Sequence, residues 1–578
     1  MTEISRKSTQ LPRVAHVRFL SLAAWSLAAC LLGTAAIAEA QSDANDHVRA
    51  LQAAAIEQDQ SPVGHWGSDP QKYTQWASHS NRLIPVYTFG TKNAGPGIDL
   101  RSYTGENSPY RSEEAIRRIY GYLPEKTVNP KADYLDQTNI YDIQAAAFEG
   151  GKKKHIFLVV FDGMDWQTTR AAAIYNEGRV SYSEGRGTGT HFQEYMANGT
   201  SQFGYMVTSP HNNGTNVDVD EQRVLNPGGT VRGGYDPERG GPNPWTPGND
   251  PRYPVGEPGT TGMRHAYTDS SCSASSMTTG IKSYNKSINV DPAGARVSTI
   301  AHQMQAAGYG VGAVTSVPIS HATPAATYAH NVHRDDYQDL TRDLLGLRSI
   351  SHPDEPLSGL DVLIGGGWGA TRDKAPTQGK NFVPGNLFLT DADLKAVDIR
   401  EGGRYVVAIR EAGVKGAEGL AKAADKAAQS GQRLFGFYGV GAYNGHLPFT
   451  TANRDYAPVA GRRGAEKYTE ADLHENPTLA DMTREAIKVL ERQPKGFWLL
   501  VESGDVDWAN HDNNIDNSIG AVNSGDAAIK VITDWVEKHS NWEESLMIVT
   551  ADHGHYLVLT QPELLAGKPA TKSTDSAE

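Results

Sequence analysis

The sequence is poor in cysteine, and its acidic side chains outnumber its basic ones. Only two of its 578 residues are cysteine, Cys30 and Cys272, so a framework of several disulfides is excluded as a source of stability. Asp and Glu number 67 against 54 Lys and Arg, which gives a formal net charge of −13. This charge argues against a nucleic-acid partner bound through phosphate contacts. An anionic small-molecule substrate would need local positive charge at its site, from metal ions or arginine.

Long apolar runs are also scarce. One run of nearly membrane-spanning length extends from Phe19 to Ala38, between a basic start and the small-x-small sequence of residues 38–40. This order is typical of a signal peptide, residues 1–40, cleaved before Gln41. The alternatives are an uncleaved membrane anchor and a lipoprotein with its lipid on Cys30. We favour cleavage, which predicts an exported, periplasmic or extracellular protein that is free of the membrane and has a single cysteine.

Three segments lack a clear period of hydrophobic residues. Residues 41–150 are polar and turn-rich, which predicts an irregular N-terminal extension. Residues 208–262 are rich in Gly, Pro and Asn and are interpreted as a long surface insertion, and residues 568–578 as a disordered polar tail. The remaining part of 151–567 is expected to form the main domain.

Within that domain, short apolar runs alternate with helical patterns. The runs have the length of strands buried on both faces, and they lie at 155–161, 310–317, 361–364, 404–409, 433–438, 496–502 and 545–551. Helices are predicted between several of them, over 297–307 and from Thr478 to Pro494. This alternation predicts an α/β fold with a mostly parallel sheet flanked by helices.

Acidic residues follow three of the predicted strands, at Asp162, Glu502 and Asp552. In an open parallel sheet, ligands bind at the carboxyl ends of the strands, and three acidic residues at one edge are hard to explain as helix caps. Beyond Glu502, Asp507 and His511 are four residues apart, so one helical turn would put both on the same face. Mixed carboxylate and imidazole ligands suit zinc, whereas oxygen ligands suit magnesium.

A further candidate is Ser270, which follows Asp269 at the start of a predicted helix. A helix dipole and a metal ion can stabilise a serine alkoxide at this position, although the pattern alone also fits a capped helix. A sulfatase-like cysteine nucleophile is excluded at Cys272, because Ser273 and Ala274 follow it where the sulfatase motif requires proline.

Taken together in this order, the motifs resemble those of the alkaline phosphatase family over roughly residues 155–556. The segments that carry the resemblance are Asp162-Gly163-Met164, the stretch from Asp269-Ser270 to Asn285, His321-Ala322-Thr323-Pro324-Ala325, the stretch from Asp361 to Gly367, Glu502 with Asp507 and His511, and Thr550-Ala551-Asp552-His553. The resemblance implies hydrolysis of small phosphate monoesters at a site with two zinc ions and one magnesium ion. Because many members are dimers, it also suggests a homodimer.

The resemblance also implies a role for each matching residue. Ser270 would attack phosphorus and become a phosphoserine, Arg334 would bind the phosphate, and Asp269 would orient that arginine. The ligands implied for the zinc that activates Ser270 are Asp162, Asp552 and His553. The ligands implied for the other zinc are Asp507 and His511, and those for magnesium are Asp162, Thr323 and Glu502.

The sequence departs from the family pattern at three points. His321 stands where some relatives have aspartate, so it could alter the metal preference or bind zinc itself. Trp508 replaces a polar or basic residue and could narrow the approach of the substrate. The third ligand of the Asp507/His511 zinc is a downstream histidine in the family, and no histidine follows His555. Either the sequence is truncated, or the site is weakened, or a substitute serves, for which the candidates are His555, His446 and His265.

Three functions follow from this pattern. The first is a phosphomonoesterase that acts through phosphoserine. The second is a phosphodiesterase on the same metal scaffold, which greater activity on a phosphodiester than on a monoester would favour. The third is a relative that binds metal or phosphate and has lost catalysis with its third zinc ligand.

Overall fold

The computed structural model describes residues 46–255 and 264–567. The predicted signal peptide, residues 1–40, and the predicted polar tail, residues 568–578, lie outside the described residues. Part of the predicted insertion, residues 256–263, also lies outside them.

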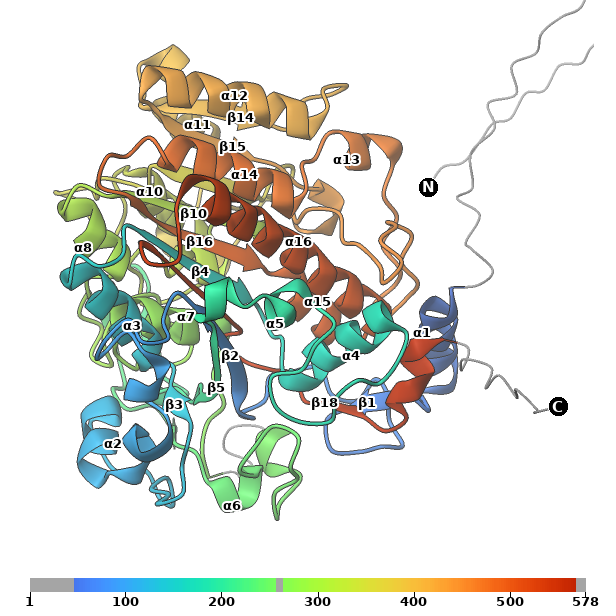
Figure 1. Cartoon of the computed structure of the whole chain (residues 1–578). Coiled ribbons are helices and arrows are strands. Elements are labelled where there is room, and N and C mark those ends of the chain that lie inside the picture. The colour runs from blue at the N-terminus through green and yellow to red at the C-terminus, as the bar shows by residue number, and fades with distance from the viewer. Residues whose placement is uncertain (1–45, 256–263, 568–578) are drawn as a thin grey trace, which may run out of the picture. The chain divides into compact units, whose positions relative to one another are not determined.

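A ten-stranded sheet forms the centre of the fold (Figure 1). Its strands follow one another in the order β14 (Tyr405–Ile409), β15 (Arg433–Phe437), β11 (Val362–Gly366), β10 (Gly310–Pro318), β16 (Phe497–Ser503), β4 (His155–Phe161), β17 (Ser545–Thr550), β2 (Ile84–Phe89), β5 (Gln202–Val207) and β3 (Leu135–Asp136). Neighbouring strands are parallel except where β2 pairs with β17 and β5. The predicted α/β fold with a mostly parallel sheet is therefore confirmed.

Helices cover both faces of the sheet. Every residue of β10 and β16 is buried, whichever face its side chain points to, so neither face is open to water. One group of helices packs on β10, β16, β4 and the β14–β15 edge, and consists of α14 (Leu479–Leu490), α16 (Ile515–His539) and α12 (Gly416–Ser430). A second group packs together beside β10 and β16, and consists of α3 (Thr138–Glu149), α7 (Ser270–Thr279), α8 (Ile300–Ala306) and α9 (Ala322–Ala325).

The helix ends follow from capping side chains. Thr478 caps α14, and Asp481 bonds back to the Thr478 backbone to form a capping box. The apolar positions Met482 and Ala486 face the sheet, as their spacing predicted. In the same way Thr299 caps α8, which therefore begins later than the predicted residue 297.

The segment predicted as an irregular extension contains regular elements. It holds α1 (His47–Gln58), α2 (Glu113–Tyr120) and α3, and it supplies β2 and β3 to the sheet. Its strand β1 (Gly64–Trp66) pairs with β18 (Leu557–Leu559) near the end of the described chain. Residues from both parts of the chain therefore lie side by side next to the carboxyl end of β17.

The segment interpreted as a surface insertion is partly buried. It forms the short strands β6 (Asn212–Asn213), β7 (Val217–Asp218), β8 (Arg223–Val224) and β9 (Val231–Arg232) and the helix α6 (Pro237–Gly240). Tyr235 and Tyr253 are almost completely buried in a small aromatic core, against Tyr110, Tyr120 and Tyr134. This part of the insertion is thus anchored to α2 and its surroundings.

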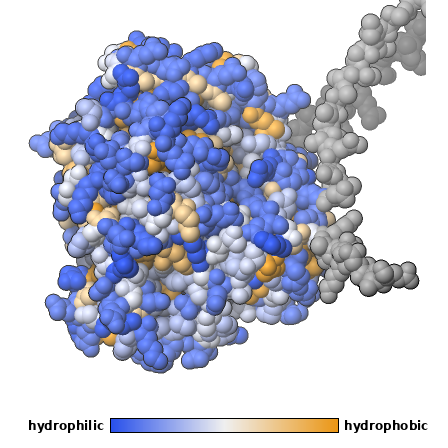
Figure 2. Space-filling model, in the orientation of Figure 1, coloured by the Kyte–Doolittle hydropathy of each residue, from blue (hydrophilic) through white to orange (hydrophobic). Residues whose placement is uncertain are grey.

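The surface is mainly polar. Figure 2 shows a face dominated by hydrophilic residues, with small and scattered hydrophobic areas. Among the described residues, no helix has the length and apolar character needed to cross a membrane.

Candidate active site

The carboxyl ends of the central strands bring the predicted acidic residues together. Glu502 and Thr550 both pair with Val160 of β4, one from each side. Asp162 and Asp552 each lie two residues beyond these positions, so the three carboxylates meet at one edge of the sheet. All three are completely buried.

These buried carboxylates have few hydrogen-bond donors to compensate for the loss of contact with water. Among the described residues, both oxygens of Asp162, Oδ2 of Asp552 and Oε1 of Glu502 are buried without a hydrogen-bond partner. Burial, followed by the charges of Asp507 and Glu502, raises the pKa of Asp162 well above its usual range. Burial also raises the pKa of Glu502, to about 8. Bare buried carboxylates of this kind are expected where cations bind.

Asp162, Asp552 and His553 form the first candidate metal group, with ligand atoms all within 4.8 Å of one another. His553 Nε2 lies 3.2 Å from Asp162 Oδ1 and 3.7 Å from Asp552 Oδ2. The other oxygen of Asp552 accepts the backbone N–H of Gly163 at 3.0 Å, which holds the carboxylate in place. Two carboxylates and one imidazole form a donor set that fits zinc.

Gly163 permits this close packing. Its φ is +72°, and a Cβ there would lie 2.8 Å from the ring of His555 and 3.0 Å from Asp507 Cα. A side chain at this position would therefore be strained and would displace the site.

Ser270 lies beside the first group at the first residue of α7. It is 2% exposed, and its Oγ lies 3.1 Å from His553 Nε2. Asp269 caps the helix by accepting the N–H of Cys272 at 3.2 Å, and Ser273 Oγ donates to the Asp552 carbonyl at 2.6 Å. The small side chains of α7 allow it to be completely buried, so these bonds fix Ser270 at the edge of the sheet.

Arg334 faces the same space from the other side. Its Nη1 donates to Asp269 Oδ2 at 3.0 Å, and its Nη2 donates to His321 Nε2 at 3.4 Å. Although burial acts in the opposite direction, Arg334 keeps the pKa of Asp269 below its usual value. Burial and then the charge of Arg334 lower the pKa of His321 to about 3, so this ring is neutral near pH 7.

The other residues predicted for the site lie around these groups. Thr323, in α9, is buried next to Glu502, and Oε2 of Glu502 accepts a hydrogen bond from the hydroxyl of Thr315. His321 contacts Trp508 edge to face at 5.8 Å between ring centres. His321 thus contacts Arg334 and Trp508, and it belongs to neither candidate metal group of the site.

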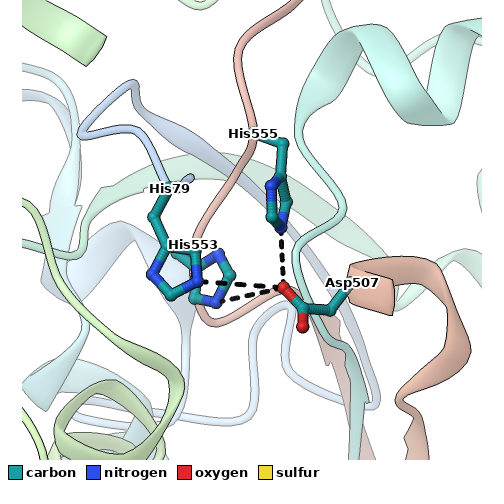
Figure 3. Close-up of side chains that lie close together, drawn as sticks. All are labelled: His79, Asp507, His553 and His555. Atoms are coloured by element: carbon teal, nitrogen blue, oxygen red, sulfur yellow. Dashed lines mark hydrogen bonds and ion pairs between the residues drawn. The ribbon is translucent and has the colours of Figure 1, made fainter. Parts of the chain in front are cut away.

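The second candidate metal group surrounds Asp507, which lies in α15 (Asp505–His511). Figure 3 shows Asp507 facing His79, His553 and His555. From Asp507 Oδ1, the distances to imidazole Nε2 atoms are 2.6 Å for His555, 3.4 Å for His511, 3.8 Å for His553 and 3.9 Å for His79. Carboxylate and imidazoles again form a donor set that fits zinc.

His79 is the one member of this group that the sequence did not predict. It lies in the loop between β1 and β2, and its ring stacks on that of His553 with 3.7 Å between centres. Of the three candidate substitutes, only His555 reaches Asp507. His265 bonds Tyr253 and His446 bonds Glu466, and neither is in the group. His79 has no neighbouring ligand in the sequence, so no spacing pattern could have indicated it.

The site opens to solvent through a pocket of about 490 Å³. Ser270, Arg334, Asp507 and His79 line it, together with Trp508. Two further basic residues, Lys286 and Arg463, contribute to its wall. An acidic protein therefore has positive side chains where an anion would enter.

The sequence is similar to those of known alkaline phosphatases. The chain is 27% identical to alkaline phosphatase 4 of Bacillus subtilis over 316 residues, covering 53% of this chain and 55% of that protein. It is 29% identical to the alkaline phosphatase of Escherichia coli over 332 residues, covering 53% and 62%. The chain thus spans about half to three fifths of the length of these relatives.

A solved structure and a family model also match. The crystal structure of Thermus thermophilus alkaline phosphatase is similar with a TM-score of 0.42 and 20% identity, covering 70% of this chain and 60% of that chain. The model of the family described as alkaline phosphatase matches residues 235–574, more than half of the sequence. The chain therefore belongs to the alkaline phosphatase family.

Proposed function

We propose that this protein hydrolyses small phosphate monoesters through a phosphoserine intermediate on Ser270. The observation that carries the proposal is the position of Ser270 Oγ, 3.1 Å from His553 Nε2 and at the border of a group of bare buried carboxylates. A serine hydroxyl buried only for packing would be expected to bond a nearby carbonyl, as Ser273 does.

Ser270 would act as the nucleophile. As the first residue of α7 it lies at the positive end of the helix dipole, which stabilises negative charge developing on Oγ. In the first step the Oγ–P bond forms and the bond from phosphorus to the alcohol oxygen breaks. The alcohol leaves and takes up a proton, and the phosphoryl group stays on Ser270.

Arg334 would bind the phosphoryl oxygens. Its bond to Asp269 occupies Nη1 on one side and fixes the plane of the guanidinium. The guanidinium has five N–H donors in a planar fork, so donors remain for two parallel bonds to phosphate oxygens. Asp269 would thus be a positioning residue rather than one that touches the substrate.

The buried acidic groups would hold metal ions. Asp162, Asp552 and His553 would bind one zinc ion, Asp507 and His511 would bind a second, and Asp162, Thr323 and Glu502 would bind magnesium. Such ions supply positive charge for the attacking and leaving oxygens and lower the pKa of bound water. In the second step a water molecule attacks phosphorus and forms a new P–O bond, the P–Oγ bond breaks, inorganic phosphate leaves, and Ser270 takes up a proton given up by the water.

The test is hydrolysis of 4-nitrophenyl phosphate at alkaline pH by the full chain supplied with zinc and magnesium. We expect Ser270→Ala to lower kcat by about 1,000-fold or more, since it removes the attacking atom. Chelation should abolish the activity, and acid quenching with labelled substrate should trap phosphate on the wild type alone. Ser276→Ala, further along α7, is the matched control and should remain active.

Two results would contradict the proposal. Full activity of Ser270→Ala would exclude the phosphoserine, and failure of the folded, metal-supplied wild type to act would exclude the hydrolase. Greater activity on bis(4-nitrophenyl) phosphate than on the monoester would assign the chain to phosphodiesters instead.

A further inference from the structure

We propose that His79, from the N-terminal part of the chain, is the third protein ligand of the metal ion held by Asp507 and His511. This inference rests on the proposed function only in its premise that the catalytic site uses this metal ion. The sequence left the third ligand open, and the geometry of four side chains now distinguishes the candidates.

The hydrogen bonds of His79 and His511 fix which nitrogen of each ring is free. His79 Nδ1 lies 2.9 Å from the carbonyl oxygen of Thr268, and His511 Nδ1 lies 2.7 Å from that of Ala77. Since a carbonyl accepts but cannot donate, each Nδ1 carries a proton, which leaves Nε2 as the nitrogen of each ring that is available to a metal ion. A hydrogen bond from Nδ1–H to a carbonyl is also the usual way in which metal-binding histidines are oriented.

The two Nε2 atoms lie close together. His79 Nε2 is 3.3 Å from His511 Nε2. One metal ion between them could accept an electron pair from each nitrogen. Asp507 Oδ1, at 3.4 Å from one nitrogen and 3.9 Å from the other, adds a negative charge to the same space.

Two of the three distances match those between ligands of one zinc ion, and the third, from His79 Nε2 to Asp507 Oδ1, is longer. With zinc–nitrogen bonds of about 2.0–2.1 Å and tetrahedral angles, two ligand atoms lie roughly 3.3–3.5 Å apart. The separations of His79, His511 and Asp507 are 3.3, 3.4 and 3.9 Å. Three protein ligands also leave the fourth position open, as a catalytic zinc site requires.

His555 does not fit as a ligand of the same ion. Its Nε2 lies only 2.6 Å from Asp507 Oδ1, which is a hydrogen-bond distance and too short for two atoms that coordinate one zinc ion. Because His555 Nε2 donates its proton to the carboxylate, His555 is not itself a ligand of the metal ion. Instead, His555 orients Asp507, as residues that hydrogen-bond metal ligands commonly do.

The backbone on both sides of His79 is held in place. Ser80 N donates to the carbonyl oxygen of Gly554 at 2.7 Å, and Ser78 Oγ bonds Tyr267 Oη at 3.0 Å. The side chain of His79 is only 13% exposed. Its ring is therefore fixed in direction before a metal binds, which lowers the entropy lost on binding.

A second group of histidines in the protein differs from the His79 group in its hydrogen bonds. His330, Asp343 and His352 are also close enough to hold an ion. There, however, His330 Nε2 bonds the Val297 carbonyl, His330 Nδ1 bonds His352 Nε2, and His352 Nδ1 bonds Arg296 Nη1. This chain of bonds gives every nitrogen of the two rings a partner, so no lone pair is left for a metal.

The experiment measures zinc binding rather than turnover. The full chain is stripped of metal, and zinc is titrated in competition with a chromophoric chelator for the wild type and for His79→Ala, His555→Ala and His352→Ala. We expect His79→Ala to weaken one zinc site by more than about 100-fold. We expect His555→Ala to weaken it by roughly 10–100-fold, which is typical of an outer partner. His352→Ala is the matched control and should bind zinc as the wild type does.

A stability measurement separates lost binding from misfolding. Metal-free His79→Ala should still unfold in one cooperative transition, although at a lower temperature than the metal-free wild type, because it loses the bond to Thr268 and the stacking on His553. Zinc should then raise the Tm of the variant less than that of the wild type. His79→Gln, whose amide can still donate to the Thr268 carbonyl, serves as a second variant with the same expectation.

Three outcomes would overturn the inference. One is unchanged zinc affinity in a folded His79→Ala, another is a larger loss in His555→Ala than in His79→Ala, and the third is a wild type with only one tight zinc site. None of these outcomes depends on hydrolysis. The assignment of His79 can therefore fail while the phosphoserine on Ser270 is confirmed, and the phosphoserine can fail while the assignment of His79 is confirmed.

Discussion

At the scale of single residues, the site is built from groups that oppose folding when no metal is present. Asp162 has no hydrogen-bond donor for either oxygen among the described residues, and it lies beside Asp552 and Glu502. Asp165, three residues later, is equally buried, but its oxygens accept bonds from Thr168 and Leu557. The two residues therefore form a natural pair for comparison.

We expect Asp162→Asn to stabilise the metal-free protein by about 1–3 kcal/mol, because it replaces a buried carboxylate that lacks donors with an amide that can donate to its neighbours. The same substitution should abolish activity with zinc and magnesium present. Urea unfolding in chelator measures the first effect. Asp165→Asn should lower stability under the same conditions, and a less stable metal-free Asp162→Asn would contradict this account of the site.

Most residues that the structure gathers at the site could be named from the sequence, because they occur in ordered motifs. Asp507 and His511, four residues apart, lie together on α15, and Asp269 meets Arg334 although 64 residues separate them. His79 could not be named, since a single histidine in a polar loop carries no spacing signal. Its place depends on the pairing of Ser80 with Gly554, which is a long-range contact.

At the scale of elements, the seven strands predicted from apolar runs are present nearly at the predicted bounds. They could be predicted because strands buried on both faces are continuously apolar. Strand β2 was not predicted, and its Pro85 explains why: proline lacks an N–H and is unusual within a sheet. The tertiary pairing of β2 with β17 and β5 overrides this local preference.

The contact between α16 and β4 can be tested with two glycine substitutions. A Cβ at Gly525 would lie 2.2 Å from Cε1 of Phe161, the residue before Asp162. Gly525→Ala should therefore lower the free energy of unfolding by about 1–3 kcal/mol, against a helix-propensity gain of about 1 kcal/mol. It should also lower kcat by about 10-fold or more, because Phe161 pushes on Asp162, the proposed metal ligand that follows it.

Gly419, in the first turn of α12, is the control. A Cβ there would meet only Val414, at 3.4 Å. Gly419→Ala should raise stability by up to about 1 kcal/mol and leave kcat unchanged. Thermal unfolding and steady-state kinetics measure both variants, and equal effects at the two positions would show that the Phe161 contact is unimportant.

At the scale of the whole molecule, stability should depend on pH in the alkaline range. Burial lowers the pKa of Lys153 from 10.5 to about 8. Because the pKa of Lys153 is lower in the folded than in the unfolded protein, its favourable contribution to stability is complete above pH 10.5. This contribution is lost as the pH falls through 8. Buried tyrosines act in the opposite sense: burial raises the pKa of Tyr122 and of Tyr405 to about 12. Their contribution is complete below pH 10 and is lost as the pH rises through 12.

We therefore expect the free energy of unfolding of the wild type to rise relative to that of Lys153→Met between pH 8 and 10.5. Above that range both proteins should lose stability together, with tyrosinate absorbance appearing as they unfold. Denaturant titrations at several pH values measure this difference. Lys152→Met, at the exposed neighbouring position, should show no such rise, and a constant difference between wild type and Lys153→Met would contradict the prediction.

The position of β4 has a consequence for biosynthesis. Its two partners, β16 and β17, are the last strands of the sheet to be made. A ribosome that has delivered β4 must therefore add most of the chain before either edge of that strand is covered, and such distant pairings form slowly. A chain that ends before β17 has neither Asp552 nor His553, so the candidate metal group of Asp162, Asp552 and His553 forms only after the last strand of the sheet has been made.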